Sequence, residues 1–107
     1  MKSNLKQTTG DIIRQLRENR GLPLRKIAAL LDIDTSYYSK IERNEKKATK
    51  IHIQKLEAFF ELDKNSLLIQ YLSDKILYEI SDEDCADEVL KVIKKQVNTL
   101  KHTKNKL

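Results

Sequence analysis

Apolar side chains recur along most of the chain at spacings of three and four residues, the period that gathers them on one face of an α-helix. Polar breaks separate these runs, and the 107 residues include only 2 Gly and 1 Pro, so we expect short connections. The pattern predicts an all-α protein of six helices. The expected helices are Asp11–Asn19, Leu24–Leu31, Thr35–Arg43, about His52–Glu61, a fifth that follows Asp63 and runs through Ile80, and a sixth that follows Ser81 and runs to about His102.

Short polar residues stand where several of these helices are expected to begin. Asp34, Thr49 and Asp63 can cap the third, fourth and fifth helices, because their side-chain oxygens can accept from a free backbone N–H of the first turn. Ser81, followed three residues later by Asp84, resembles a capping box ahead of the sixth helix. The sequence therefore indicates where the helices start as well as their apolar faces.

Residues 24–43 contain two short helices around a three-residue break. Ala28 supplies the small side chain that two crossing helices need, and Ile33 and Ile41 are apolar, as packing between the helices requires. A helix-turn-helix that places its second helix in the major groove of DNA has this layout, and so does an ordinary helical hairpin of a small α-domain. The spacing favours the DNA-binding motif.

The charge distribution points to the same part of the chain. Lys and Arg number 21 against 16 Asp and Glu, a net charge of +5. The whole excess lies in residues 1–72, whereas residues 73–107 are neutral, with acids crowded in 74–88 and lysines in 91–106. This order suits one helix, because acids at its start and lysines at its end complement the helix dipole. The basic first part favours a nucleic-acid partner.

Several functional classes are disfavoured by the composition. The single Cys rules out a disulfide framework and fits a reducing cytoplasm, where we expect the protein to act. Cys85, His52 and His102 make no ligand set for zinc, and two Gly are too few for a phosphate-binding loop. No apolar run approaches the roughly 20 residues of a membrane span. We expect no enzyme activity, catalytic residue, metal, cofactor or membrane partner.

Three segments of the sequence resemble a known protein family. They are Arg-Glu-Asn-Arg-Gly at 17–21, Leu-Arg-Lys-Ile-Ala at 24–28 and Ser-Lys-Ile-Glu-Arg-Asn at 39–44. They are similar to the lambda-repressor-like, or Xre-type, helix-turn-helix family over roughly residues 10–70. The resemblance implies a five-helix DNA-binding domain, usually dimeric, that regulates transcription in prokaryotes. We accordingly divide the chain into a flexible arm at 1–9, this domain at 10–70 and a C-terminal helical dimerisation region at 71–107.

The resemblance also implies roles for single residues. The family's base-reading positions fall on Thr35, Ser36 and Lys40, of which Lys40 can donate to O6 and N7 of guanine. Arg17 and Glu42 match a pair that the family commonly buries as a salt bridge between the first and third helices. The residues expected to contact the DNA backbone or groove are Arg25, Tyr37, Arg43, Lys46, Lys47 and Lys50.

The sequence departs from the family pattern at several positions. Asp32 and Asn44 stand where the family usually has glycine in a left-handed backbone, a conformation that Asp and Asn tolerate better than other side chains. Leu24 replaces a frequent Gln near the start of the second helix. One phosphate contact of the family is lost there, and we expect Arg25 or Arg20 to replace it.

The expected C-terminal helix carries a second functional feature. Its apolar residues step by 4, 3, 4 and 3, the a/d pattern of a coiled-coil seam of about two heptads, and one further residue widens the stripe. These residues are Ala86, Val89, Leu90, Ile93, Val97 and Leu100. The stripe favours self-association, although packing on the fifth helix as ordinary core would use the same residues.

Two functions from different classes remain open on this evidence. The first is a homodimeric regulator that binds a palindromic or pseudo-palindromic operator in double-stranded DNA. The second is a protein-interaction module, of the antitoxin or anti-regulator type, whose C-terminal helices bind a protein partner. Salt-dependent binding to an operator would favour the first, and co-purification of an unrelated protein the second.

Overall fold

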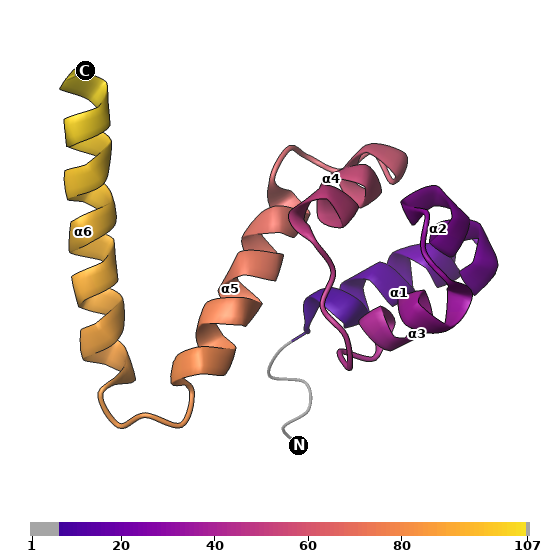
Figure 1. Ribbon diagram of the computed structural model, residues 1–107, viewed down its shortest axis with the longest axis horizontal. Helices are drawn as coiled ribbons and strands as arrows, with labels where there is room; N and C mark the ends of the chain where they lie inside the picture. The colour runs from indigo at the N-terminus through magenta and orange to yellow at the C-terminus, as the bar shows by residue number, and fades with distance from the viewer. Residues whose placement is uncertain (1–6, 107) are drawn as a thin grey trace. The chain divides into compact units, whose positions relative to one another are not determined.

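The computed structural model describes the backbone of residues 7–106 and the side chains of residues 7–103. The regular elements in that range are all helices, so the predicted all-α class is confirmed (Figure 1). They are α1 (Thr9–Asn19), α2 (Leu24–Leu31), α3 (Thr35–Glu42), α4 (Lys50–Phe59), α5 (Ser66–Ile80) and α6 (Ala86–Lys106). Residues 1–6, most of the expected N-terminal arm at 1–9, lie outside the described residues.

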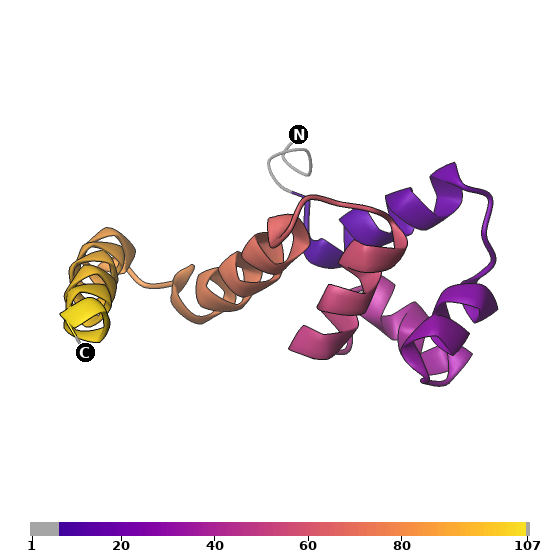
Figure 2. The same ribbon diagram turned by 90° about the horizontal axis from the view of Figure 1, so that it is seen from above.

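The chain forms two compact units, residues 1–74 and residues 75–107. The first unit contains α1 to α4 and most of α5, and the second contains the end of α5 together with α6. Within the first unit, α1 and α2 both pack on α3, and α2 also contacts α4, as can be followed in Figures 1 and 2. The division between the units falls inside α5, a few residues beyond the expected end of the DNA-binding domain at 70.

The core of the first unit draws apolar side chains from all five of its helices. Ala28 is only 2% exposed, and its small side chain lets α2 pack closely on α3. Each large apolar side chain that is fully buried contributes about 1.5–3 kcal/mol to folding. The buried set is Ile13, Ile27, Ala28, Leu31, Tyr38, Ile41, Ala48, Ile53, Leu56, Phe60, Leu67, Leu68 and Tyr71.

Polar side chains cap α1 and α4 but not α2 and α3. Thr49 caps α4, as predicted. The structure starts α1 two residues earlier than the sequence predicts, because Thr8 and Asp11 form a capping box in which each side chain accepts from the other's backbone N–H at 3.2 Å. Asp34 occupies the N-cap position of α3, but its carboxylate forms no capping hydrogen bond.

The start of α5 is held by a side chain that the sequence does not single out. Asp63 is not the cap, because α5 begins at Ser66. Instead the buried carboxylate of Glu57, on α4, accepts from the backbone N–H groups of Leu67 and Leu68 at 2.9 Å each. A carboxylate at a helix N-terminus satisfies free donors and complements the helix dipole. This contact fixes α5 against α4.

The predicted start of α6 is wrong by several residues. Residues 81–85 form turns, which are closed by hydrogen bonds from the backbone N–H of Glu83 to the carbonyl of Ile80 and from that of Ala86 to the carbonyl of Glu83. The helix starts at Ala86, beyond the Ser81–Asp84 pair. The three consecutive acids Asp82, Glu83 and Asp84 therefore lie in the turns that precede the helix and not in its first turn.

Each of the first four helices ends in the same way. One residue adopts a left-handed backbone, and its N–H and that of the following residue bond back to carbonyls of the last turn. The left-handed residues are Gly21 (φ 63°), Asp32 (φ 61°), Asn44 (φ 64°) and Glu61 (φ 56°). The left-handed conformation predicted for Asp32 and Asn44 is therefore confirmed. Glu61 is the unexpected member, because a long side chain gives no local hydrogen bond to offset the strain.

We predict that Glu61→Gly stabilises the protein by about 0.5–1 kcal/mol. A left-handed backbone costs most residues about 1–2 kcal/mol, and glycine avoids this cost in the folded protein. Glycine also has more freedom in the unfolded chain, which offsets part of the gain in stability. As the matched opposite change, Gly21→Ala should destabilise by about 1 kcal/mol through strain alone, because nothing lies within 4 Å of a Cβ there. Urea unfolding followed by circular dichroism measures both. A Glu61→Gly protein that is less stable than the parent contradicts the strain argument.

Candidate nucleic-acid interface

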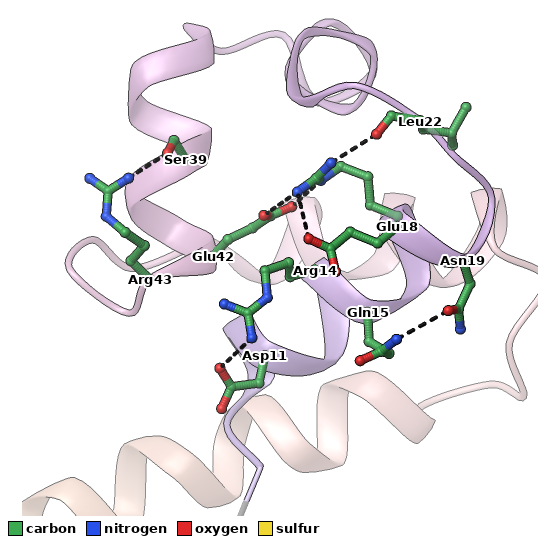
Figure 3. A network of polar contacts seen from close by, with 10 residues as sticks. Asp11, Arg14, Gln15, Glu18, Asn19, Leu22, Ser39, Glu42 and Arg43 are labelled. Carbon is green, nitrogen blue, oxygen red and sulfur yellow. Dashed lines mark hydrogen bonds and ion pairs between the residues drawn. The ribbon is translucent and has the colours of Figure 1, made fainter.

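A buried ion pair joins α3 to α1. Arg17 of α1 meets Glu42, the last residue of α3, through two parallel contacts, with Nε 2.7 Å from Oε2 and Nη2 3.0 Å from Oε1. The two side chains are 12% and 4% exposed. The Nη1 group of Arg17 also donates to the carbonyl of Leu22 at 2.8 Å (Figure 3). One guanidinium therefore holds α1, the α1–α2 turn and α3 together.

The side chain of Tyr38 is buried beside this pair. Burial, and then the carboxylate of Glu42, raise the pKa of the Tyr38 hydroxyl, which forms no hydrogen bond within the described residues. The hydrogen bonds that Arg17 donates to Glu42 raise the pKa of Arg17 as well. Arg17 therefore stays charged and Tyr38 stays neutral across the physiological pH range.

A close backbone approach secures the end of α3 from the other side. A Cβ on Gly10, in the first turn of α1, would lie 2.5 Å from the carbonyl oxygen of Glu42 and 2.7 Å from that of Ile41. Asn44 adds a hydrogen bond from its Nδ2 to Oγ1 of Thr8 at 2.8 Å. This role of Gly10 was not predicted, because Gly10 precedes the helix expected at Asp11–Asn19 and only the longer α1 places it inside a helix.

The outward side of α3 is open to solvent. Thr35 and Ser36, in its first turn, are exposed, and so is Lys40 one turn beyond Ser36. Arg25, in the first turn of α2, is exposed as well. The inward side of α3 carries Tyr38, in the core, so the helix has one buried and one open face. The three predicted base-reading side chains therefore belong to the open face.

The comparisons with known proteins decide the family. A family model described as helix-turn-helix matches residues 13–67, just over half of the chain. The chain belongs to the lambda-repressor-like helix-turn-helix family. This family binds DNA and is not a family of enzymes. No curated protein and no solved structure matches the chain. In this helix-turn-helix protein α2 and α3 are the two helices of the motif, and α3 is its recognition helix.

Neither a metal centre nor a membrane span occurs in the part of this helix-turn-helix chain that the structure describes. Among those residues, no group of three or more His, Cys, Asp and Glu side chains is placed to hold a metal ion. The described helices include none that is both long enough and apolar enough to cross a membrane.

The loop after the recognition helix is folded back onto it. The backbone N–H groups of Glu45 and Lys46 both donate to the carbonyl of Lys40, at 2.8 and 3.3 Å. The hydroxyl of Tyr37 donates to the carbonyl of Lys47 at 3.1 Å. Tyr37 is half-buried and packs against the core, so the structure shows it positioning the loop. Its contact with DNA stays a prediction.

The first turn of α4 follows this loop and carries Lys50, which is exposed. Its capping box is unusual, because His52 takes the place of the customary Glu or Gln. The backbone N–H of Thr49 donates to Nδ1 of His52, and that of His52 donates to Oγ1 of Thr49, both at 3.1 Å. Burial and the charge of Lys55 lower the pKa of His52. The contribution of this box to stability is therefore present above about pH 6.5 and is lost as the pH falls through the lowered pKa.

Arg20 serves the fold rather than the open face. Its guanidinium donates to the carbonyls of Phe59 and Phe60 at 3.4 and 3.3 Å, where α4 ends. It also lies 5.7 and 5.0 Å from the centres of the two phenylalanine rings, within the range of cation–π contacts. Arg25 therefore remains the candidate for the phosphate contact that Leu24 cannot make.

One acidic side chain, Glu45, stands inside the basic cluster and was missed by the sequence analysis. Its carboxylate contacts Nε and Nη2 of Arg43 at 3.0 and 3.2 Å. Nη1 of Arg43 donates to Oγ of Ser39 at 2.6 Å, the contact of Arg43 that Figure 3 shows. The hydrogen bonds and charge of Arg43, with a smaller effect of Lys40, lower the pKa of Glu45. Glu45 thus occupies two donors of Arg43 that a contact with DNA phosphate would need. It is the sole acid in residues 43–50, which is the signal that could have marked it.

We predict that Glu45→Gln tightens DNA binding and steepens its dependence on salt. Arg43 then becomes available to a phosphate, which adds about one counterion released on binding and raises the slope of log K against log salt by about one. Fluorescence anisotropy over a salt series measures both. Asp63→Asn, at the exposed α4–α5 turn, removes the same charge and is the control. If both variants show the same small gain, the effect is one of net charge and Glu45 does not restrain Arg43.

Proposed function

We propose that this protein is a sequence-specific transcription regulator that binds a palindromic or pseudo-palindromic operator as a homodimer. The observation that carries the proposal is the presentation of α3. Its inner side is locked to α1 by the Arg17–Glu42 pair, while Thr35, Ser36 and Lys40 are exposed on its outer side. A rigid helix with short polar side chains at its start and a lysine one turn later suits the major groove.

The surroundings of α3 support the same function. Arg25 on α2 and Lys46, Lys47 and Lys50 after the recognition helix are all exposed. Phosphate contacts of this kind supply most of the affinity and fix the position of the motif on DNA, but they carry no base information. Base recognition then rests on α3, with Lys40 as the one long donor that can reach O6 and N7 of guanine.

Dimerisation is the second part of the proposal. One recognition helix makes too few base contacts for strong specificity, and two copies on one face of DNA must lie about 34–36 Å apart. The exposed apolar residues of α6 offer a surface for that association. The same exposure favours a second candidate function, in which α6 binds an unrelated protein. Such a partner would co-purify with the chain and would not depend on operator DNA.

Selection of bound sequences from random double-stranded DNA tests the proposal. We expect the full chain to enrich an inverted repeat. Lys40→Ala should lower specific affinity by roughly 1–3 kcal/mol and relax the preference at one base pair in each half-site. The matched variants Lys46→Gln and Lys50→Gln should bind all DNA more weakly and with a flatter salt dependence, but should enrich the same motif.

The outcomes of this selection are distinct. Failure to enrich any motif under low salt contradicts the proposed function. Enrichment of an unchanged motif by Lys40→Ala removes Lys40 from the base-reading residues and leaves the rest of the proposal standing. An unchanged salt slope for Lys46→Gln and Lys50→Gln shows that this loop does not touch phosphate.

A further inference from the structure

The apolar stripe of α6 is accessible to a partner. Leu90, Val97 and Leu100 are 47%, 43% and 60% exposed, and no described residue of α6 is buried. Ala86, Val89 and Ile93 are half-buried. At 1.5 Å per residue the stripe from Ala86 to Leu100 is about 21 Å long, enough for two heptads of coiled-coil contact.

The charges of α6 are segregated along its length. Asp87 and Glu88 lie in the first turn, and the charged residues from Lys91 to Lys101 are all lysines. Two parallel copies would place the acidic turns side by side and the lysines side by side. Two antiparallel copies would place each acidic turn beside the lysines of the other copy. The helix is therefore complementary to itself only when one copy is reversed.

The heptad positions sharpen this argument. With Leu90 and Val97 at a and Ile93 and Leu100 at d, the e positions beside the stripe are Asp87, Lys94 and Lys101. In an antiparallel pair a residues pack against d residues, and e positions face e positions. If Leu90 packs against Leu100 of the partner subunit, Asp87 faces Lys101 of the partner subunit, and the same contact recurs by symmetry. Lys94 then meets its own copy at the two-fold axis, so this register has two contacts between opposite charges and one between like charges. In a parallel pair g positions face e positions, so Val89 would face Lys94 of the partner subunit and Gln96 would face Lys101 of the partner subunit. No opposite charges meet in that arrangement.

We propose that two copies of this chain associate through α6 in an antiparallel pair, with Leu90 against Leu100 and Asp87 against Lys101 across the two-fold axis. The inference rests on the proposed dimeric function and gives the dimer a geometry. The helix dipole alone also favours acids at the start and lysines at the end of α6. The dipole, however, acts equally on Asp87 and Glu88, whereas the antiparallel pair distinguishes them. Glu88 stands at position f, on the far side from the stripe.

Charge reversal separates the two effects. Asp87→Lys should weaken the dimer about tenfold, because it replaces two attractive contacts with two repulsive ones. Glu88→Lys makes the same change of charge in the same turn and should leave the dimer within about twofold of the parent. The exchanged variant Asp87→Lys with Lys101→Asp should recover most of the affinity. Sedimentation equilibrium of the full chain, without DNA, measures all four proteins.

Chemical cross-linking tests the geometry directly. The variant that carries both Asp87→Cys and Lys101→Cys is made in a Cys85→Ser background and treated with a short bismaleimide. The linked peptides are then identified by mass spectrometry. An antiparallel pair joins residue 87 of one copy to residue 101 of the other. Within one helix the two positions are about 21 Å apart, beyond the reach of the reagent. Each single-cysteine variant should stay unlinked.

Three results would overturn the inference. They are a parent chain that is monomeric at 100 µM, links between identical positions, and equal weakening by Asp87→Lys and Glu88→Lys. None of these measurements involves DNA, so failure of the antiparallel pair and failure of operator binding are separate results.

Discussion

The buried contact between Arg17 and Glu42 is the interaction on which the arrangement of the first unit depends. It joins the last turn of α1 to the last residue of α3 and, through the carbonyl of Leu22, to the turn that leads into α2. Removing one partner of a buried pair leaves an uncompensated charge, which typically costs 3–5 kcal/mol. That cost is a large share of the 5–15 kcal/mol that stabilises an ordinary small domain. The pair therefore fixes the orientation of α3 and also holds this helix against α1.

The open side of the same helix is governed by weaker and more adjustable forces. Its cations are exposed, so their attraction to DNA depends on ionic strength and on the charges around them. Glu45 is the clearest case, because it occupies two of the donors of Arg43. The protein thus combines a charge-paired attachment on the inner side of α3 with exposed cations on and after α3, one of which, Arg43, is paired with Glu45. Affinity can be tuned on this surface without disturbing the buried pair that holds α3.

The sequence predicts the local structure of this protein better than its long-range contacts. The bounds of α2 follow from its apolar spacing, and the left-handed Asp32 and Asn44 follow from the known tolerance of these residues. The tasks of Glu57 and Glu45 were not predicted, because each depends on which segment lies opposite in the folded chain. The start of α6 was misplaced because the Ser81–Asp84 pattern is local and does not reveal the backbone turns that close between Ile80 and Ala86.

A thermodynamic cycle on Arg17 and Glu42 tests the central claim most directly. The free energies of unfolding of the parent, Arg17→Met, Glu42→Met and the double variant are measured by urea denaturation. If the buried pair holds α3 in place, each single variant loses about 3–5 kcal/mol, and the double variant loses far less than the sum because no unpaired charge remains. Losses that add, or single losses below about 1 kcal/mol, as for an exposed pair, would contradict the account.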